Sequence, residues 1–115
     1  MSVALFDEPL QEKDLDAMAN NARTATDFLK ALGHEGRLMI LCYLADGERS
    51  VTELEELLAA RQPAVSQQLA RLRIEGLVDA RREGKTIYYS IADAKTRKAV
   101  EFLYNMFCRD SATPC

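Results

Sequence analysis

Residues 62–91 constrain the fold most, because they specify a helix and then a hairpin in immediate succession. Pro63 suits the first position of a helix, and the run QPAVSQQLARLRIEGLV repeats apolar side chains at helical spacing until Gly76 ends it. Two runs of alternating apolar residues follow, over 77–82 and 85–91, with a glycine turn between them. A chain with these elements is expected to fold as a mainly α protein with one small β-hairpin.

Upstream of this segment the sequence predicts three more helices. Apolar residues recur every three or four positions over 14–32, and Gly33-His34-Glu35-Gly36 interrupts them. A second helix with one apolar face (Leu38, Leu41, Cys42, Ala45) follows. Ser50 and Glu53 have the spacing of a capping box that starts a short third helix. Downstream of the hairpin, Asp93 can cap a final helix. The predicted order is therefore α-α-α-α-β-β-α in one domain over 1–115, with 1–10 and 110–115 as flexible tails.

The first and last helices carry more apolar surface than a small domain needs for its own core. A three–four apolar seam suits a partner helix, and wide apolar area on a terminal helix indicates burial against a second subunit. We therefore expect a homodimer. The residues expected at its interface are Leu15, Met18, Ala22, Leu29, Leu103 and Phe107.

Charge is unevenly distributed along the chain. Residues 61–90 hold six basic and three acidic side chains, a balance of +3, whereas the whole chain has a formal charge of −3. A basic patch of this kind is typical of nucleic-acid binding, although it is also compatible with an ordinary solvated face. No apolar run is long enough to span a bilayer and no signal peptide is visible, so we expect a cytoplasmic protein without a membrane partner.

The motifs V-S-x-x-L, L-R-x-x-G-L-V, R-R-E-G-K and Y-Y, in that order, resemble those of the ArsR/SmtB family of winged helix-turn-helix repressors. The resemblance covers about residues 15 to 108. It implies a homodimer, joined through its first and last helices, that binds double-stranded DNA at an inverted-repeat operator. The fourth helix would enter the major groove and the hairpin wing would contact flanking DNA. The positions that the resemblance implies for DNA contact are Pro63, Ala64, Ser66, Gln67 and Gln68 at the start of the fourth helix, and Arg81, Arg82, Lys85 and Thr86 on the wing. The helical spacing adds Arg71, which is expected on the exposed face of the fourth helix.

The sequence departs from this family at its known metal sites. The third helix reads VTELEELL and has no cysteine, and Lys95 stands where a histidine ligand is expected after Asp93. The only histidine, His34, is expected to be a solvated turn residue. We therefore expect no metal and no organic cofactor.

The three cysteines are Cys42, Cys108 and Cys115. A cytosolic location predicts reduced thiols rather than a disulfide framework. Cys42 and Cys108 lie on apolar helix faces, where cysteine often acts as a small hydrophobic residue. Their contexts, L-M-I-L-C-Y-L and L-Y-N-M-F-C, are similar to those of a subgroup known as the biofilm-growth and sulfide-oxidation repressors. This resemblance implies redox sensing by Cys42 and Cys108, with reactive sulfur species as inducer and release of DNA when the two are bridged. Cys115 is interpreted as a tail thiol.

Three other functions remain open from the sequence. The first is a soft-metal-responsive repressor that uses Cys42 and Cys108 with a third ligand. The second is a winged-helix protein-interaction module without DNA binding. An enzyme is the weakest alternative, because the sequence has no Ser/His/Asp set, no glycine-rich phosphate loop and no obvious pair of carboxylates.

Overall fold

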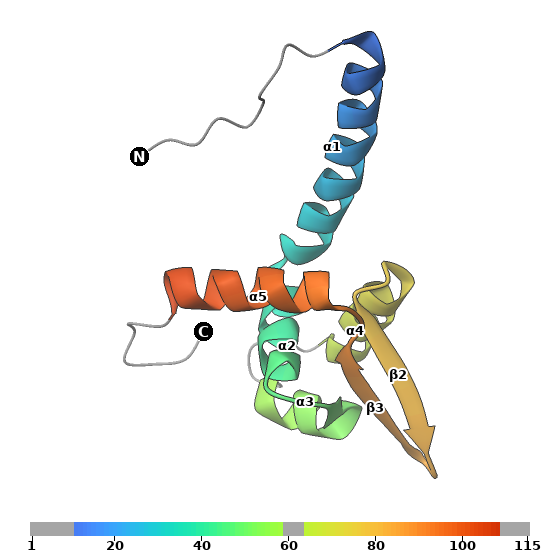
Figure 1. The fold of residues 1–115 in the computed structure, drawn as a ribbon. Helices are drawn as coiled ribbons and strands as arrows, with labels where there is room; N and C mark the ends of the chain where they lie inside the picture. The colour runs from blue at the N-terminus through green and yellow to red at the C-terminus, as the bar shows by residue number, and fades with distance from the viewer. Residues whose placement is uncertain (1–10, 59–63, 109–115) are drawn as a thin grey trace. The chain divides into compact units, whose positions relative to one another are not determined.

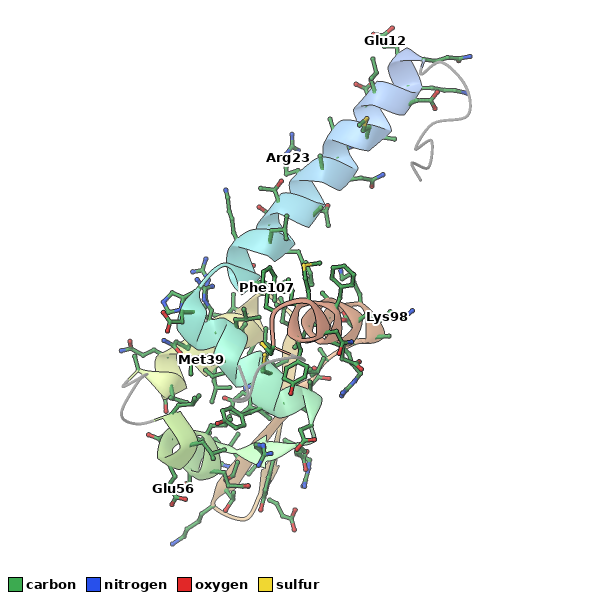
Figure 2. The ribbon with its side chains drawn as sticks, turned by 90° about the vertical axis from the view of Figure 1, so that its left-hand side faces the viewer. Glu12, Arg23, Met39, Glu56, Lys98 and Phe107 are labelled. Atoms are coloured by element: carbon green, nitrogen blue, oxygen red, sulfur yellow. The ribbon has the colours of Figure 1, made fainter. Side chains whose placement is uncertain are left out.

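The computed structural model describes residues 11–58 and 64–108, so Pro63, Cys115 and both expected tails lie outside the described residues. Its packing divides the chain into two units, residues 1–30 and 31–115. The first unit contains most of α1 (Glu12–Leu32), which begins two residues before the predicted helix. Side chains project from it on all sides, Arg23 among them (Figure 2). Its apolar residues Leu15, Met18 and Leu29 are 52%, 45% and 63% exposed, which leaves the predicted seam available to a partner.

The second unit contains four helices and a three-stranded antiparallel sheet. In chain order its elements are α2 (Glu35–Ala45), β1 (Arg49–Ser50), α3 (Val51–Leu58), α4 (Val65–Ile74), β2 (Val78–Glu83), β3 (Thr86–Ile91) and α5 (Ala94–Phe107). The strands lie in the order β1-β3-β2, and β2 and β3 form a hairpin that extends away from α5 (Figure 1). The predicted fold class is confirmed. The two-residue strand β1 was not predicted, because its pairing with Tyr88 and Tyr89 is not visible in so short a segment.

The second helix, α2, is the centre of this unit. Ile40, Leu41 and Leu44 have no exposed surface, and α2 packs against α4, α5 and β3. The predicted apolar face was therefore rotated from the buried one, because Leu38, Cys42 and Ala45 are only partly buried and of the predicted set only Leu41 is fully buried. The buried residues Gly36, Ile40, Leu41 and Leu44 lie on the neighbouring side of the helix. Apolar residues such as Leu38 and Met39 also occur on the half-buried sides, so the sequence has no strong amphipathic pattern that shows the orientation.

Local backbone signals were easier to predict. The Ser50 hydroxyl accepts from the Glu53 amide at 3.1 Å, and the Glu53 carboxylate accepts from the Ser50 amide at 3.1 Å, which confirms the capping box. At the end of α4, Gly76 has a φ of 80°, and the amides of Gly76 and Leu77 donate to the carbonyls of Arg73 and Leu72. This is the Schellman arrangement, which favours glycine at that position.

The hairpin turn is also local in origin. Glu83 pairs with Thr86, so Gly84 and Lys85 form a two-residue turn in which Gly84 has a φ of 63°. Glycine is favoured at the first position of such a turn when φ is positive there. No helix among the described residues is long and apolar enough to cross a membrane.

The cap of α5 generates a prediction about stability. An Asp93 carboxylate oxygen accepts from the Thr96 amide at 2.8 Å, and this hydrogen bond, supported by one from the Thr96 side chain, lowers the pKa of Asp93. We expect Asp93→Ala to lower the free energy of unfolding by about 1 kcal/mol at pH 7, whereas Asp93→Asn keeps most of the cap. Urea unfolding at equal protein concentrations measures both.

The pH dependence of this effect has a defined sign. The folded-state pKa is lower than the unfolded one, so the charge-dependent part of the stabilisation is complete above the ordinary aspartate pKa. It is lost as pH falls through the folded-state pKa. The difference between wild type and Asp93→Asn should therefore shift in favour of Asn on acidification, and a difference that is constant from pH 7 to pH 3 would contradict this account.

Candidate nucleic-acid interface and thiol pocket

The exposed face of α4 carries most of the predicted reading residues. Val65, Leu69 and Leu72 are buried, and Ser66, Gln67 and Arg71 are exposed on the other side. Ala64 is partly buried, so a short side chain lies where the helix begins. Gln68 differs from the prediction, because its side-chain oxygen is buried. Position 68 is next to the buried row in a helix of 3.6 residues per turn, on the flank of the exposed face.

The hairpin separates the two arginines that were predicted to act together. Successive residues of a strand point to opposite faces of the sheet. Arg82 lies opposite Ile87, and Arg81 lies opposite Tyr88. Arg82 and Lys85 are exposed, and neither forms an ion pair within residues 11–58 and 64–108. Thr86 is partly exposed beside them, so this part of the wing is free to meet a phosphate.

Arg81 is engaged within the molecule instead. Its Nε and Nη2 atoms donate to the two carboxylate oxygens of Glu48, each at 2.7 Å, and its Nη1 donates to Glu83 at 2.7 Å. Its guanidinium also lies over the Tyr88 ring, 4.6 Å from the centroid. These contacts lower the pKa of Glu48 and raise that of Arg81. The predicted role of Arg81 as a DNA contact therefore competes with three strong intramolecular hydrogen bonds.

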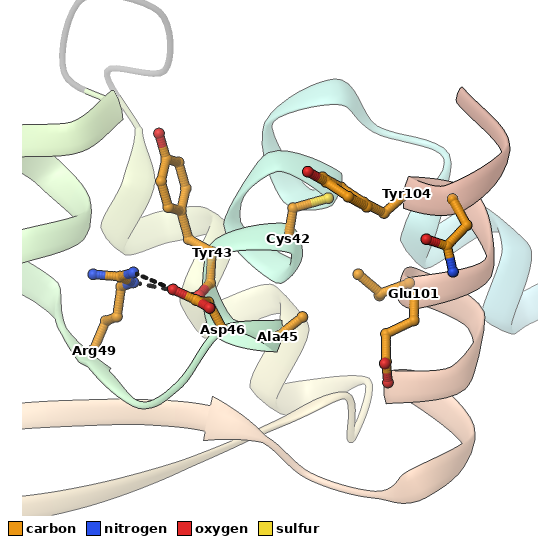
Figure 3. Close-up of a pocket in the computed structure, with 9 residues that line it drawn as sticks. Cys42, Tyr43, Ala45, Asp46, Arg49, Glu101 and Tyr104 are labelled. Atoms are coloured by element: carbon orange, nitrogen blue, oxygen red, sulfur yellow. Dashed lines mark hydrogen bonds and ion pairs between the residues drawn. The ribbon is translucent and has the colours of Figure 1, made fainter. Parts of the chain in front are cut away.

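Cys42 lines a cavity of about 480 Å³ between the C-terminal half of α2, the turn before β1, and α5. Its side chain projects from α2 toward Tyr104 on α5 (Figure 3). The thiol is free and half-buried, and burial raises its pKa, so less of it is thiolate at neutral pH than in an exposed cysteine. The other residues that line the cavity are Tyr43, Ala45, Asp46, Arg49, Val100, Glu101, Tyr104 and Asn105.

Two arginines fix the surroundings of this cavity. Arg49 donates to the Tyr43 carbonyl at 3.3 Å and forms an ion pair with Asp46 at 3.3 Å. Arg97 on α5 donates to the Ala45 carbonyl at 2.8 Å, which ties α5 to the C-terminal end of α2. The sequence analysis did not identify either residue. Arg97 and Ala45 are 52 positions apart, and no local pattern announces such a contact.

Cys108 is at the C-cap of α5, where its amide donates to the Tyr104 carbonyl at 2.8 Å, and it is only 6% exposed. It is disulfide-bonded, whereas Cys42 is free. The expectation of unpaired thiols was therefore wrong for Cys108. That expectation rested on the redox state of a compartment, which carries no information about which sulfur atoms are close enough to bond.

The described residues contain no group of three or more His, Cys, Asp or Glu side chains that could hold a metal ion. Asp93, a ligand position in the family, caps α5 here. His34 is exposed, as predicted, but it also has a structural role. Its Nδ1 atom accepts from the Gly36 amide at 3.1 Å and so caps the N-terminus of α2.

Comparison with known proteins agrees with this arrangement. Residues 34–80 match the family described as bacterial regulatory protein, arsR family. The chain is 48% identical to a biofilm growth-associated repressor of Agrobacterium fabrum over 105 residues. These aligned residues make up 90% of this chain and 90% of the relative. It is 41% identical to the transcriptional activator HlyU of Vibrio cholerae, covering 84% of this chain and 89% of the relative.

Solved structures give the same result. Reduced HlyU from Vibrio cholerae superposes with a TM-score of 0.76 at 41% identity, over 81% of this chain and 98% of that chain. The transcriptional repressor BigR from Xylella fastidiosa superposes with a TM-score of 0.70 at 41% identity, over 86% and 98%. On its fold, its motifs and these relatives, the chain belongs to the ArsR family and is a winged helix-turn-helix transcriptional regulator.

Proposed function

We propose that this protein is a homodimeric repressor that binds an inverted-repeat DNA operator and releases it when Cys42 and Cys108 become bridged in response to reactive sulfur species. Exposed Ser66 and Gln67 on α4 would read bases in the major groove, and Arg82 and Lys85 on the wing would contact flanking phosphates. The exposed apolar residues of α1 and α5 would form the dimer interface. These include Leu29 and Phe107, which are 63% and 73% exposed.

The observation that carries the proposal is the free Cys42 thiol in a cavity that opens against α5, the helix whose C-cap is Cys108. A covalent bond between these two residues would join α2 to α5. Because α2 also packs against α4 and β3, a change at the α2–α5 contact reaches the elements that would meet DNA. Similarity to a biofilm growth-associated repressor supports the choice of a repressor.

The chemistry balances without a metal or an organic cofactor. The Cys42 thiolate attacks a sulfane sulfur of a polysulfide, whose S–S bond breaks, and the displaced fragment leaves with the electron pair. The Cys42 persulfide then attacks the Cys108 sulfur and breaks its existing disulfide, and the former partner sulfur leaves as a thiolate. The product is a bridge with one added sulfur atom. When Cys108 is a thiol, a second polysulfide takes up the two electrons.

The length of the bridge between Cys42 and Cys108 provides selectivity for polysulfide over peroxide. A plain disulfide requires Cα atoms within about 7 Å and correctly aimed side chains, whereas added sulfur atoms span a longer gap without strain.

The first prediction concerns DNA reading. We expect Gln67→Ala to cost about 1–3 kcal/mol on the selected operator and little on random DNA, because an amide that reads a base acts only at its own sequence. Arg82→Ala should weaken binding to both duplexes, because it removes a phosphate contact. It should also reduce the salt slope, which is the slope of log affinity against log salt concentration, by about 1. Fluorescence anisotropy at several salt concentrations measures these effects. Equal losses on both duplexes for Gln67→Ala would contradict its role.

The second prediction concerns assembly. Leu29→Glu or Phe107→Glu should give monomers that do not hold the operator at nanomolar protein, because each places a carboxylate in an apolar interface. Analytical ultracentrifugation measures the assembly. Glu56→Gln, on exposed α3, is the control and should remain dimeric. Dimers that persist in both interface variants would place the contact elsewhere.

The third prediction concerns the switch. Under reducing conditions wild type, Cys42→Ser and Cys108→Ser should all bind the operator, because neither thiol lies on α4. After polysulfide treatment only wild type should release it, and peptide mapping by mass spectrometry should find Cys42 joined to Cys108 with added sulfur.

Cys115→Ser should still release DNA, because the proposed bridge does not include this residue and a second polysulfide completes the bridge when Cys108 is a thiol. Release that persists in Cys42→Ser would contradict the proposal. Stoichiometric zinc binding through Cys42 that releases DNA by itself would favour the metal-responsive alternative instead.

A further inference from the structure

Arg81 connects all three strands of the sheet. It starts from the edge strand β2, passes over the ring of Tyr88 on the middle strand β3, and ends on Glu48, immediately before the other edge strand β1. Glu48 precedes β1, and its carboxylate is bound by the same guanidinium that lies over the Tyr88 ring. We call Glu48, Arg81, Glu83 and Tyr88 the Arg81 clamp.

The Arg81 clamp engages all three nitrogen atoms of the Arg81 guanidinium. A guanidinium has five N–H donors on three nitrogens, and here all three nitrogens donate to a carboxylate oxygen at 2.7 Å. The two bonds to Glu48 form the bidentate geometry in which arginine pairs are strongest. Two carboxylates surround one cation, so the cluster presents negative charge to an approaching phosphate. Arg82, the next residue, points to the other face and has no such partner among the described residues.

We propose that Arg81 is a positioning residue, which holds the wing against the turn between α2 and β1, and that it is not a phosphate contact. The inference rests on the proposed DNA binding and assigns the wing's contacts to Arg82 and Lys85. β1 offers β3 only two paired positions, Arg49 with Tyr89 and Ser50 with Tyr88, so the ladder alone is a weak anchor for the hairpin. The clamp adds a side-chain anchor at the same edge.

The position of the anchor links the wing to the thiol cavity. Glu48 lies between Asp46 and Arg49, which both line the cavity that contains Cys42. Arg49 and Asp46 are also paired with one another at 3.3 Å (Figure 3). A change in this turn therefore moves the residue to which the wing is fastened. Local contacts supply the connection, and no long path through the core is needed.

The experiment compares Arg81→Gln, Glu48→Gln, the double variant and Arg82→Gln on a duplex selected from random sequence by the wild-type protein. We expect Arg81→Gln and Glu48→Gln each to weaken binding by about two- to fivefold, because exposed ion pairs contribute modestly. Neither should change the salt slope. The double variant should be no weaker than either single variant. Arg82→Gln, the matched control, should reduce the slope by about 1.

Glu48→Gln is the decisive variant. It removes a negative charge, which by itself would favour DNA binding, and yet it should lower the affinity for DNA. If Arg81 were a phosphate contact restrained by Glu48, then Glu48→Gln would bind more tightly and Arg81→Gln would lose as much slope as Arg82→Gln. Either result overturns the inference.

A second measurement does not depend on DNA. Amide hydrogen exchange of 78–91 in the full chain should be faster in Arg81→Gln and Glu48→Gln than in wild type, and unchanged in Arg82→Gln. Unchanged exchange in Arg81→Gln and Glu48→Gln would contradict the proposal that the Arg81 clamp holds the wing. Failure of the wild-type protein to bind any duplex would count against the proposed function alone, because the exchange result still decides whether the clamp holds the wing.

Discussion

The packing of α2 against α4, α5 and β3 is the constraint on which the rest of the second unit depends. Ile40, Leu41 and Leu44 have no exposed surface, and helices and sheet pack around them. Protein interiors are close-packed, so α4, α5 and β3 cannot shift independently against a helix that touches them all. Cys42 follows Leu41 directly and therefore lies where α2 meets α5, at the boundary of this packed centre. In the proposed switch, a bond made there acts on an element that packs against α4, α5 and β3.

Elements whose cause is local could be predicted from the sequence. The spacing of Val65, Leu69 and Leu72 defines the buried side of α4, and Gly76 ends it with a positive φ that few other residues adopt. Ser50 and Glu53 cap α3 through each other, three positions apart. In each case the interacting atoms are within one helical turn in the chain. The same reasoning placed Ser66 and Gln67 on the exposed side of α4.

Features that depend on distant residues could not be predicted. The partner of Arg81 is Glu48, 33 positions away, and nothing near either residue distinguishes this arginine from Arg82. Period-two alternation alone would have put the two arginines on opposite faces, but which face meets a carboxylate is set by the path of the chain through β1. The one-face interpretation of α2 failed for a related reason. α2 carries apolar residues on its half-buried sides as well, so its sequence has no polar stripe that shows which side is buried.

In the proposed function, these pairings would also explain how an acidic chain binds a polyanion selectively. Between residues 64 and 90, Arg71 pairs with Glu75 at 3.0 Å and Arg81 with Glu48 and Glu83, which leaves Arg73, Arg82 and Lys85 without ion pairs within the described part of the chain. Each phosphate contact contributes to salt-dependent affinity for any DNA sequence, so few free cations mean weak binding to random DNA. The formal charge of −3 reduces that binding further. In the proposed function, discrimination then falls on Ser66 and Gln67, whose neutral side chains would contribute at the operator and very little elsewhere.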